Sequence, residues 1–242
     1  MSCSALLRSA AYALVQLVVT PPYALIALAT FAFPPLVRYQ IISNWARLMV
    51  WSAQHICGIR YRVLGAENIP ETPCIILAKH ESAWETLVLQ VIFPPQVWVV
   101  KRELLWIPFF GWGLAMLSPI AIDRKSGARA LRQTLEQGRA RLQQGFSIVI
   151  FPEGTRSAPG VRGNYQIGGA WLATKTGAPV VPVAHNAGSY WRRNAFVKYP
   201  GVVTVSIGPP LDPQGKKAPE LMRSVEGWIE NEMARIRLNE AR

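Results

Sequence analysis

His80 and Glu85 are the residues whose types and spacing most clearly permit catalysis. An imidazole can act as a general base near neutral pH, and it needs a partner that fixes its tautomer. Five residues along a helix correspond to about 140° of rotation, so helical spacing alone does not place the two side chains on one face. They can meet only if His80 precedes the first full turn of a helix and folds back.

A second group of polar residues lies at positions 151–157, with the sequence FPEGTRS. Gly154 permits a close approach of the backbone to a ligand. Arg156 has the side chain best suited to bidentate recognition of phosphate. The alternative is a surface turn held by an ion pair, because Pro-x-Gly is common in turns.

Each of these two groups follows a short apolar run, at residues 74–78 and 146–150. Such runs are typical of buried strands. In open α/β sheets, ligands bind at the edge where strands end and helices begin. The sequence therefore predicts that His80 and Arg156 lie at the same edge of one sheet.

Both motifs resemble those of the glycerolipid acyltransferase family. Its first block is His-x4-Asp, in which this chain has Glu85 in place of Asp, and its third block is matched without change by residues 151–156. An intermediate block that is basic, then rich in Pro and Gly, is similar to the segment from Lys101 to Arg124. A last block containing Val-Pro is similar to residues 178–183, so the resemblance covers about residues 60 to 210.

The resemblance implies that an acyl group passes from acyl-CoA or acyl-carrier protein to the free hydroxyl of 1-acylglycerol 3-phosphate (lysophosphatidic acid), which gives phosphatidic acid. It implies no cofactor beyond this acyl donor. Another lyso-lipid acceptor, such as a lyso-ornithine lipid, and a non-enzymatic membrane lipid-binding protein are the alternatives. The implied roles are His80 as base, Glu85 as its orienting partner, and Lys101, Arg124, Glu153, Gly154, Thr155 and Arg156 as substrate-binding residues.

The composition indicates contact with a membrane and with anionic ligands. The 242 residues are 50% hydrophobic and only 17% charged, with a mean hydropathy of +0.17. The formal net charge of +12 suits anionic lipids or phosphorylated substrates. Long apolar stretches without a nucleic-acid-binding module argue against nucleic acid as a partner.

The cysteines point to neither a metal site nor a disulfide framework. Cys3, Cys57 and Cys74 are odd in number and lack metal-ligand spacing, which fits a reducing compartment. No Gly-x-Ser-x-Gly nucleophile motif is present in the sequence either. We therefore expect the acceptor hydroxyl to attack the acyl donor directly, without a covalent enzyme intermediate.

The N-terminal quarter of the chain predicts a membrane anchor. No charged residue lies between Arg8 and Arg38, a stretch longer than the roughly 20 residues that cross a bilayer core. A cleaved signal peptide, one spanning helix and a two-helix anchor partly embedded in one leaflet are the alternatives. We favour two helices, at residues 4–33 and 36–57, because Arg47 makes a second spanning helix costly.

The expected organisation is thus an anchor at residues 1–58 and an α/β acyltransferase domain at residues 59–242, on the cytoplasmic face of the inner membrane. The domain is expected to hold a mixed, largely parallel sheet flanked by helices. Strands are predicted at residues 74–78, 97–100, 146–150, 180–184 and 202–207, and helices at 86–93, 127–144, 166–176 and 220–237.

Three further features have less specific interpretations. His55 is expected to be a polar residue at an interface. His185 follows a predicted strand, which would allow it to border the pocket, and it is expected to have a structural or accessory role. The aromatic segment 106–112 fits either the core or a membrane interface, where Trp and basic side chains are favoured.

Overall fold

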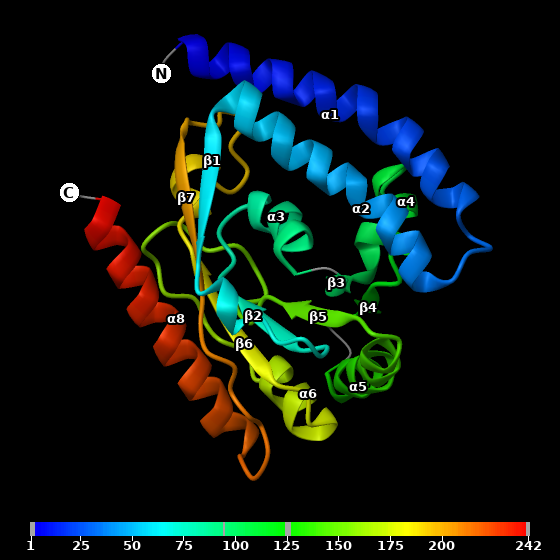
Figure 1. Cartoon of the computed structure of the whole chain (residues 1–242), viewed down its shortest axis with the longest axis vertical. Coiled ribbons are helices and arrows are strands. Elements are labelled where there is room, and N and C mark those ends of the chain that lie inside the picture. The colour runs from blue at the N-terminus through cyan, green and yellow to red at the C-terminus, as the bar shows by residue number, and fades with distance from the viewer. Residues whose placement is uncertain (1–2, 94, 124–126, 241–242) are drawn as a thin grey trace.

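The computed structural model describes residues 3–93, 95–123 and 127–240. Its centre is a seven-stranded sheet with the order β1-β7-β6-β2-β5-β3-β4 (Figure 1). All neighbouring strands are parallel except β6 and β7. The predicted mixed, largely parallel sheet is therefore confirmed. The strands are β1 (Ile59–Leu64), β2 (Ile75–Ala78), β3 (Gln96–Lys101), β4 (Ile120–Ile122), β5 (Ser147–Ile150), β6 (Val180–His185) and β7 (Gly201–Ile207).

The register of the central strands brings the chemical motifs to one edge. Leu77 of β2 pairs with Ile150 of β5 on one side and with Pro182 of β6 on the other. These strands are parallel, so the residues that follow them emerge at the same end of the sheet. The edge predicted for His80 and for residues 151–157 is the one observed.

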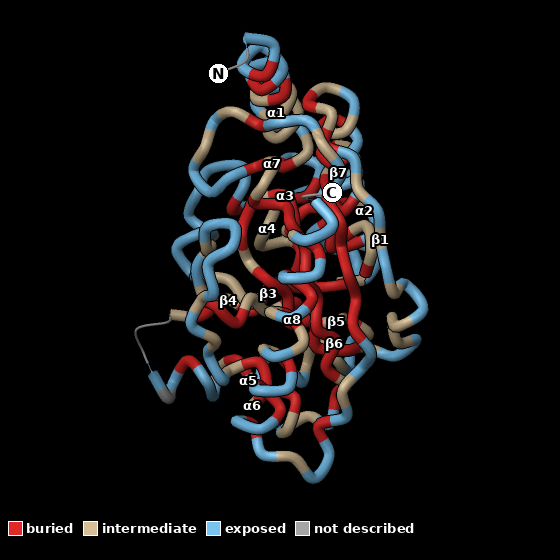
Figure 2. Tube along the Cα trace, turned by 90° about the vertical axis from the view of Figure 1, so that its left-hand side faces the viewer, coloured by how far each residue is buried: buried red, intermediate tan, exposed pale blue. Residues whose placement is uncertain are grey.

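Helices cover both sides of this sheet (Figure 1). On one side, α3 packs against α2, and α4 packs against α1. On the other side, α8 packs against β6 and α6, and α5 packs against α6. Strands β5 and β6 are buried between these layers (Figure 2). The helices are α1 (Cys3–Ala29), α2 (Pro35–Ser52), α3 (Trp84–Ile92), α4 (Phe110–Met116), α5 (Ala128–Gln143), α6 (Gly168–Thr176), α7 (Ala187–Tyr190) and α8 (Ala218–Glu240), with a π-helix at Ala53–Cys57 and 3-10 turns at Ala66–Asn68 and Arg102–Trp106.

The two N-terminal helices form as a hairpin, but they differ in their surroundings. Helix α1 continues through Pro21 and Pro22 to Ala29. It has leucines that are largely exposed, such as Leu17 at 71%. Helix α2 instead buries one face, which includes Met49 and Val50, and packs against α3. The second helix is thus part of the folded core as well as of the hairpin.

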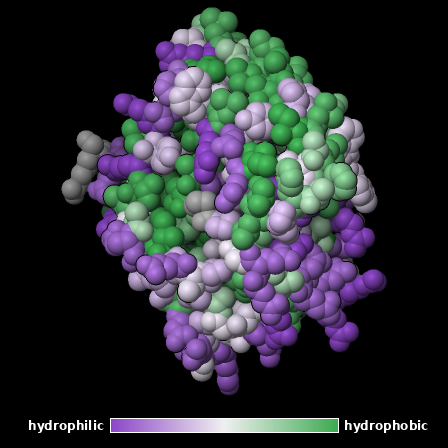
Figure 3. Space-filling model, turned by 45° about the vertical axis from the view of Figure 1, so that its right-hand side comes forward, coloured by the Kyte–Doolittle hydropathy of each residue, from purple (hydrophilic) through white to green (hydrophobic). Residues whose placement is uncertain are grey.

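Helix α1 is the only helix within the described residues that is long and apolar enough to cross a membrane. Hydrophobic residues gather over the upper part of the molecule, where α1 and α2 lie, and hydrophilic residues gather below (Figure 3). Tyr12 of α1 is fully buried and meets Trp191 edge to face, at 5.5 Å between ring centroids. One side of α1 is therefore attached to the domain, while its other side is an apolar surface.

Candidate active site

His80 and Glu85 form a direct hydrogen bond. His80 lies in the loop between β2 and α3, four residues before the helix begins, and its Nδ1 is 2.7 Å from Glu85 Oε1. Glu85 lies in the first turn of α3, and the same oxygen accepts backbone N–H bonds from Glu81 at 3.1 Å and Ser82 at 2.8 Å. The carboxylate therefore folds the loop back so that the ring reaches it. His80 thus precedes the first turn of the helix and folds back onto Glu85, as the five-residue spacing requires.

The environment of Glu85 keeps its carboxylate ionised. Its side chain is fully buried, whereas that of His80 is 17% exposed. Burial opposes the charged form, but the hydrogen bonds from His80 and from the Ser82 amide outweigh it, so the pKa of Glu85 lies below its ordinary value. An ionised carboxylate can only accept, so Nδ1 of His80 carries the proton. This tautomer leaves Nε2 unprotonated and able to act as a base.

The second motif is connected to the first by several contacts. The backbone N–H of His80 donates to Glu153 Oε1 at 2.9 Å, and the backbone N–H of Ser157 donates to the His80 carbonyl at 2.8 Å. The Phe151 ring stacks on the His80 imidazole, with 4.0 Å between centroids and 13° between planes. The loop after β5 therefore fixes both the backbone and the ring of His80.

Lys79 links this assembly to the last helix. Its side chain is 1% exposed, and Nζ lies 3.2 Å from Glu153 Oε2 and 2.9 Å from Glu230 Oε1 of α8. Nζ also donates to the carbonyl of Val161 at 3.1 Å. Buried charges persist in proteins when they are paired and hydrogen-bonded in this way. Glu153 thus braces the His80 loop from behind.

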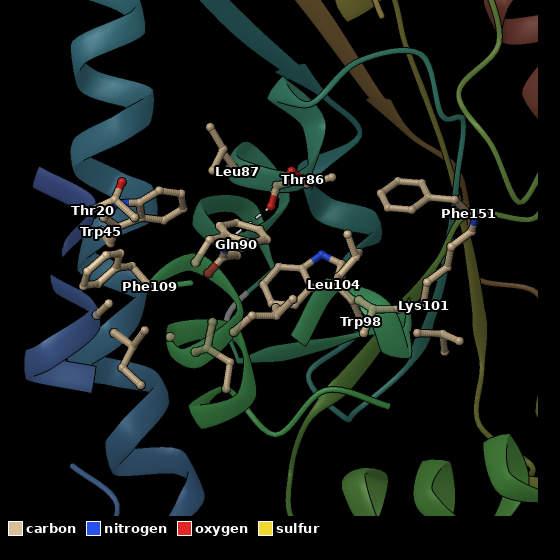
Figure 4. A pocket seen from close by; sticks show the side chains of 18 of the residues that line it. Thr20, Trp45, Thr86, Leu87, Gln90, Trp98, Lys101, Leu104, Phe109 and Phe151 are labelled. Atoms are coloured by element: carbon tan, nitrogen blue, oxygen red, sulfur yellow. Dashed lines mark hydrogen bonds between the residues drawn. The ribbon is translucent and has the colours of Figure 1, made fainter. Parts of the chain in front are cut away.

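A cavity of about 410 Å³ opens in front of His80. Its apolar part lies against α1 and α2, where Trp45 and Thr20 line it, and against Phe109 (Figure 4). Phe151 and Lys101 lie on the opposite side of the view, at the ends of β5 and β3 (Figure 4). The cavity thus runs from the apolar hairpin to the polar edge of the sheet.

The cavity separates the predicted site residues into two groups. Glu85 and Glu153 are not among its lining residues; both hold the His80 loop from behind. Arg124 lies outside the described residues. His80, Lys101, Gly154, Thr155 and Arg156 line the cavity.

Gly154 is required by its backbone conformation. Its φ is +68°, in the left-handed region that favours glycine. Its N–H donates to the Phe151 carbonyl at 3.0 Å, which closes the turn that carries Thr155 and Arg156 to the cavity. Residues 151–154 therefore form the turn that the sequence predicts, and Arg156 after it lines the cavity.

The structure also places residues that the sequence interpretation left out of the site. Arg193, from the segment after α7, lines the cavity beside Arg156. No motif in the sequence marks it, since it follows β6 by a further helix and turn. Its only signal was the basic pair formed with Arg192.

His185 is a structural residue behind the site. It is fully buried, its Nε2 lies 2.8 Å from the Lys79 carbonyl, and its Nδ1 accepts the Ala187 N–H at 3.2 Å. Burial lowers the pKa of His185, although the Glu85 charge acts in the opposite direction. A neutral imidazole with both nitrogens occupied ties β6 to the His80 loop and leaves no basic nitrogen for catalysis.

The exposure of the side chains decides where the aromatic segment 106–112 and His55 lie. Trp106 is 70% exposed and Ile107 is 44% exposed, so the aromatic segment 106–112 is not a core segment. His55 is exposed at the end of the hairpin, where its Nδ1 lies 2.8 Å from the Trp51 carbonyl. In the described part of the chain, no cluster of three or more His, Cys, Asp or Glu side chains is arranged to hold a metal ion.

Glu81 is a buried carboxyl group beside this pair. It is 1% exposed, and its Oε2 accepts the Gly188 N–H at 3.3 Å. Gly188 leaves the necessary room, because a Cβ there would lie 2.8 Å from Oε2. Burial, followed by the nearby charge of Glu85, raises the pKa of Glu81 to about 8. Glu81 is therefore protonated in the folded protein at neutral pH.

This raised pKa predicts a loss of stability as the pH rises. In the unfolded chain the Glu81 carboxyl titrates near 4.5, so between that pH and about 8 the folded state binds the extra proton. Stability falls with pH wherever the folded state binds more protons. At about 1.4 kcal/mol per pKa unit, the loss of free energy of unfolding by pH 9 is on the order of 5 kcal/mol.

Glu81→Gln keeps the shape and removes the titration, so its free energy of unfolding should fall less between pH 5 and pH 9 than that of the wild type. Denaturant unfolding at several pH values measures this difference. Glu67→Gln, at an exposed glutamate, is the matched control and should follow the wild type. Parallel curves for wild type and Glu81→Gln would contradict the assignment of a protonated Glu81.

Comparison with known proteins adds the family. A family model described as Acyltransferase matches residues 60–186. The chain is 48% identical over 203 residues to the 1-acyl-sn-glycerol-3-phosphate acyltransferase of Pseudomonas aeruginosa, an alignment that covers 82% of this chain and 79% of that protein. It is 30% identical over 196 residues to 1-acyl-sn-glycerol-3-phosphate acyltransferase alpha of Bos taurus, which covers 78% and 68% of the two chains.

The fold is shared with a solved structure. The crystal structure of the 1-acyl-sn-glycerophosphate acyltransferase of Thermotoga maritima matches with a TM-score of 0.81 at 24% identity, over 96% of this chain and 95% of that one. The segment matched by the family model contains His80, Glu85 and Arg156, which are the residues that the geometry brings to one edge of the sheet. This chain belongs to the acyltransferase family.

Proposed function

We propose that this protein transfers a fatty acyl group from acyl-CoA or acyl-carrier protein to the free hydroxyl of 1-acylglycerol 3-phosphate, with phosphatidic acid as the product. One observation carries the proposal: a single cavity is lined by His80, by Arg156 and by the apolar side chains of the N-terminal hairpin. A base, a cation and an apolar channel are what a phosphorylated acceptor and a fatty acyl thioester require. The activity for which the Pseudomonas aeruginosa relative is named supports the same reaction.

His80 would act as the general base in this reaction. Its Nε2 takes the proton of the acceptor hydroxyl as the oxygen attacks the thioester carbonyl carbon. The negative charge of Glu85 stabilises the imidazolium that forms, through the 2.7 Å hydrogen bond to Nδ1. The carbon–sulfur bond then breaks, and the thiolate recovers the proton from Nε2. The acceptor becomes acylated and the free thiol leaves, with no acyl group on the enzyme.

The two ends of the cavity suit the two parts of the substrates. Lys101, Thr155 and Arg156 supply polar and cationic groups near His80, where the acceptor phosphate would bind. Ala27, Ile42 and other apolar side chains of the hairpin surround the opposite end, where an acyl chain would be removed from water. Glu153 contributes indirectly, by holding the His80 backbone.

We also propose that residues 1–58 hold the protein on the cytoplasmic face of the inner membrane, next to the catalytic domain formed by residues 59–242. The apolar outer surface of α1 motivates this, because Leu7, Leu14, Leu17 and Val18 are all at least 60% exposed. The exposed aromatic segment 106–112 runs from the end of the 3-10 turn Arg102–Trp106 into α4, and α4 packs against α1. Lipid substrates would then reach the cavity from the bilayer.

Charges on the outer face of α1 should release the protein from membranes. Replacing both Leu14 and Leu17 by Glu places two carboxylates on exposed positions, and each charge costs about 2.5–3.5 kcal/mol in the apolar region of a bilayer. We expect most of the variant to appear in the soluble fraction after cell lysis. Sedimentation of membranes with immunodetection measures this.

Leu238→Glu is the matched control, because this leucine of α8 is 68% exposed and lies on a different helix. The control variant should remain with the membranes, like the wild type. A double α1 variant that sediments with the membranes as completely as the wild type would assign the attachment to another surface.

A panel of acceptors tests the proposed function. Purified full-length protein is given one acyl-CoA and, in separate reactions, 1-acylglycerol 3-phosphate, a lyso-ornithine lipid and a lysophospholipid with a neutral headgroup. We expect rapid formation of phosphatidic acid and much slower acylation of the other two. Acylation of the lyso-ornithine lipid alone would transfer the assignment to that substrate, and acylation of none would remove the enzymatic function.

A further inference from the structure

We infer that Arg193 is a second arginine for the phosphate of the acceptor, an assignment that rests on the proposed function. Arg193 and Arg156 both line the cavity that contains His80. Arg193 Nη1 donates to the Arg156 carbonyl at 2.8 Å, and Arg156 Nη2 donates to Asn194 Oδ1 at 3.4 Å. These reciprocal contacts connect the loop after α7 to the turn after β5.

The loop that carries Arg193 is held against α1 at both ends. Trp191 is 8% exposed and packs on Tyr12. Lys198 is 4% exposed, and its Nζ lies 4.5 Å from the Trp191 ring centroid and 5.2 Å from that of Tyr12. The backbone N–H of Lys198 donates to Ser9 Oγ at 2.9 Å. The segment between Trp191 and Lys198 is therefore fixed at both ends, and it places Arg193 at the cavity.

Arg193 and Arg156 are two neighbouring cations that an anion from outside the chain would neutralise. Other arginines of the protein form ion pairs, such as Arg162 with Glu226 and Arg235 with Glu232, both at 2.6 Å. In the described portion of the chain, no carboxylate lies within ion-pair distance of Arg156 or Arg193. Two neighbouring cations repel each other, and a dianion between them reverses the sign of that interaction.

A phosphate monoester is the anion that fits two guanidinium groups. It carries close to two negative charges at neutral pH and presents several oxygens for fork-shaped hydrogen bonding. Each charge-assisted bond of this type contributes enough for about 10- to 100-fold in affinity. One arginine alone leaves part of that charge uncompensated, so the second arginine adds both affinity and orientation.

The position of the pair favours the phosphate of the acceptor over the phosphates of an acyl-CoA donor. In 1-acylglycerol 3-phosphate the free hydroxyl and the phosphate lie on adjacent carbons of the glycerol. A phosphate held by Arg156 and Arg193 thus keeps the hydroxyl in the part of the cavity that His80 lines. In acyl-CoA, a long pantetheine arm separates the thioester from every phosphate.

Steady-state kinetics of the purified full-length enzyme test this assignment, with each substrate varied at a saturating level of the other. Arg193→Ala should raise the KM for 1-acylglycerol 3-phosphate about 10- to 100-fold and leave the KM for acyl-CoA within about twofold. Arg193→Lys should recover only part of the loss, because a lysine keeps the charge but lacks the planar fork. With 1-monoacylglycerol, an acceptor without phosphate, wild type and Arg193→Ala should react at equal rates.

Arg192→Ala is the matched control, since this neighbouring arginine is exposed and is not a lining residue of the cavity. It should behave as the wild type with 1-acylglycerol 3-phosphate, acyl-CoA and 1-monoacylglycerol. An Arg193→Ala enzyme that matches Arg192→Ala in its acceptor KM overturns the inference, as does a rise in the acyl-CoA KM alone. Failure of the wild type to make phosphatidic acid overturns the proposed function instead, so the two failures are distinguishable.

Discussion

Replacing His80 by alanine is expected to lower kcat for acyl transfer by about 100- to 10,000-fold, the range that a positioned general base contributes. The expectation rests on the only imidazole that faces the cavity within the described residues. Its tautomer is fixed by the 2.7 Å bond to Glu85, and its ring is fixed by stacking on Phe151. Without Nε2 the acceptor hydroxyl keeps its proton and remains a poor nucleophile.

The measurement is the rate of phosphatidic acid formation by the purified variant, together with a thermal melting curve. His55→Ala is the matched control, because this exposed histidine lies at the end of the N-terminal hairpin. We expect the control to keep the wild-type rate. A His80→Ala enzyme that turns over near the wild-type rate would remove His80 from the role of base.

Replacing Glu85 by glutamine is expected to lower kcat by about 100-fold or more. The variant keeps the shape but loses the charge that stabilises a protonated His80. The oxygen Oε1 now accepts from Nδ1 of His80 and from the N–H groups of Glu81 and Ser82. A glutamine amide can place its NH2 group there instead, and this group donates to Nδ1. The ring would then adopt both tautomers, and only one of them presents a basic Nε2.

Glu85→Asp should retain more activity than Glu85→Gln, because it keeps the charge and restores the residue usual in the family. Glu81→Gln serves as the control for a nearby buried carboxyl that is not bonded to the His80 ring, and it should keep most of the activity at neutral pH. Equal rates for Glu85→Gln and the wild type, with a large loss in Glu81→Gln, would transfer the partner role to Glu81.

The central strands and the edge that carries the site could be predicted from the sequence. Strand β2 is fully apolar and β5 is apolar after Ser147, as expected for short parallel strands buried on both faces. Two of the seven strands were not predicted. β1 alternates exposed Arg60 and Arg62 with less exposed residues, and β4 has only three residues, so neither resembles a buried run.

The remaining parts of the site depend on contacts between distant segments. Lys79 pairs with Glu230, which is 151 positions later, and no local pattern indicates this ion pair. The motif predicts that Glu153 binds the substrate, whereas in the structure its carboxylate contacts His80 and Lys79. Arg193 reaches the cavity only because Trp191 and Lys198 dock on α1.

Composition also left the second N-terminal helix ambiguous. Its apolar residues fit a membrane anchor as well as a core helix, because both require the same side chains. In the structure Ala46, Met49 and Val50 are buried inside the protein, whereas the leucines of α1 remain exposed. Only the packing partners distinguish the two cases. These partners lie in α3, and the sequence of the second helix does not reveal that it packs there.

Direct attack of the acceptor on the acyl thioester is the central claim, and labelling of the enzyme tests it most directly. Purified wild-type protein is incubated with an acyl-CoA labelled in its acyl chain, without acceptor, and the denatured protein is analysed for bound label. We predict no covalent label, and label that appears in phosphatidic acid only after 1-acylglycerol 3-phosphate is added. Stoichiometric label on the protein, transferred to the acceptor on its addition, would contradict the account and require a nucleophilic residue.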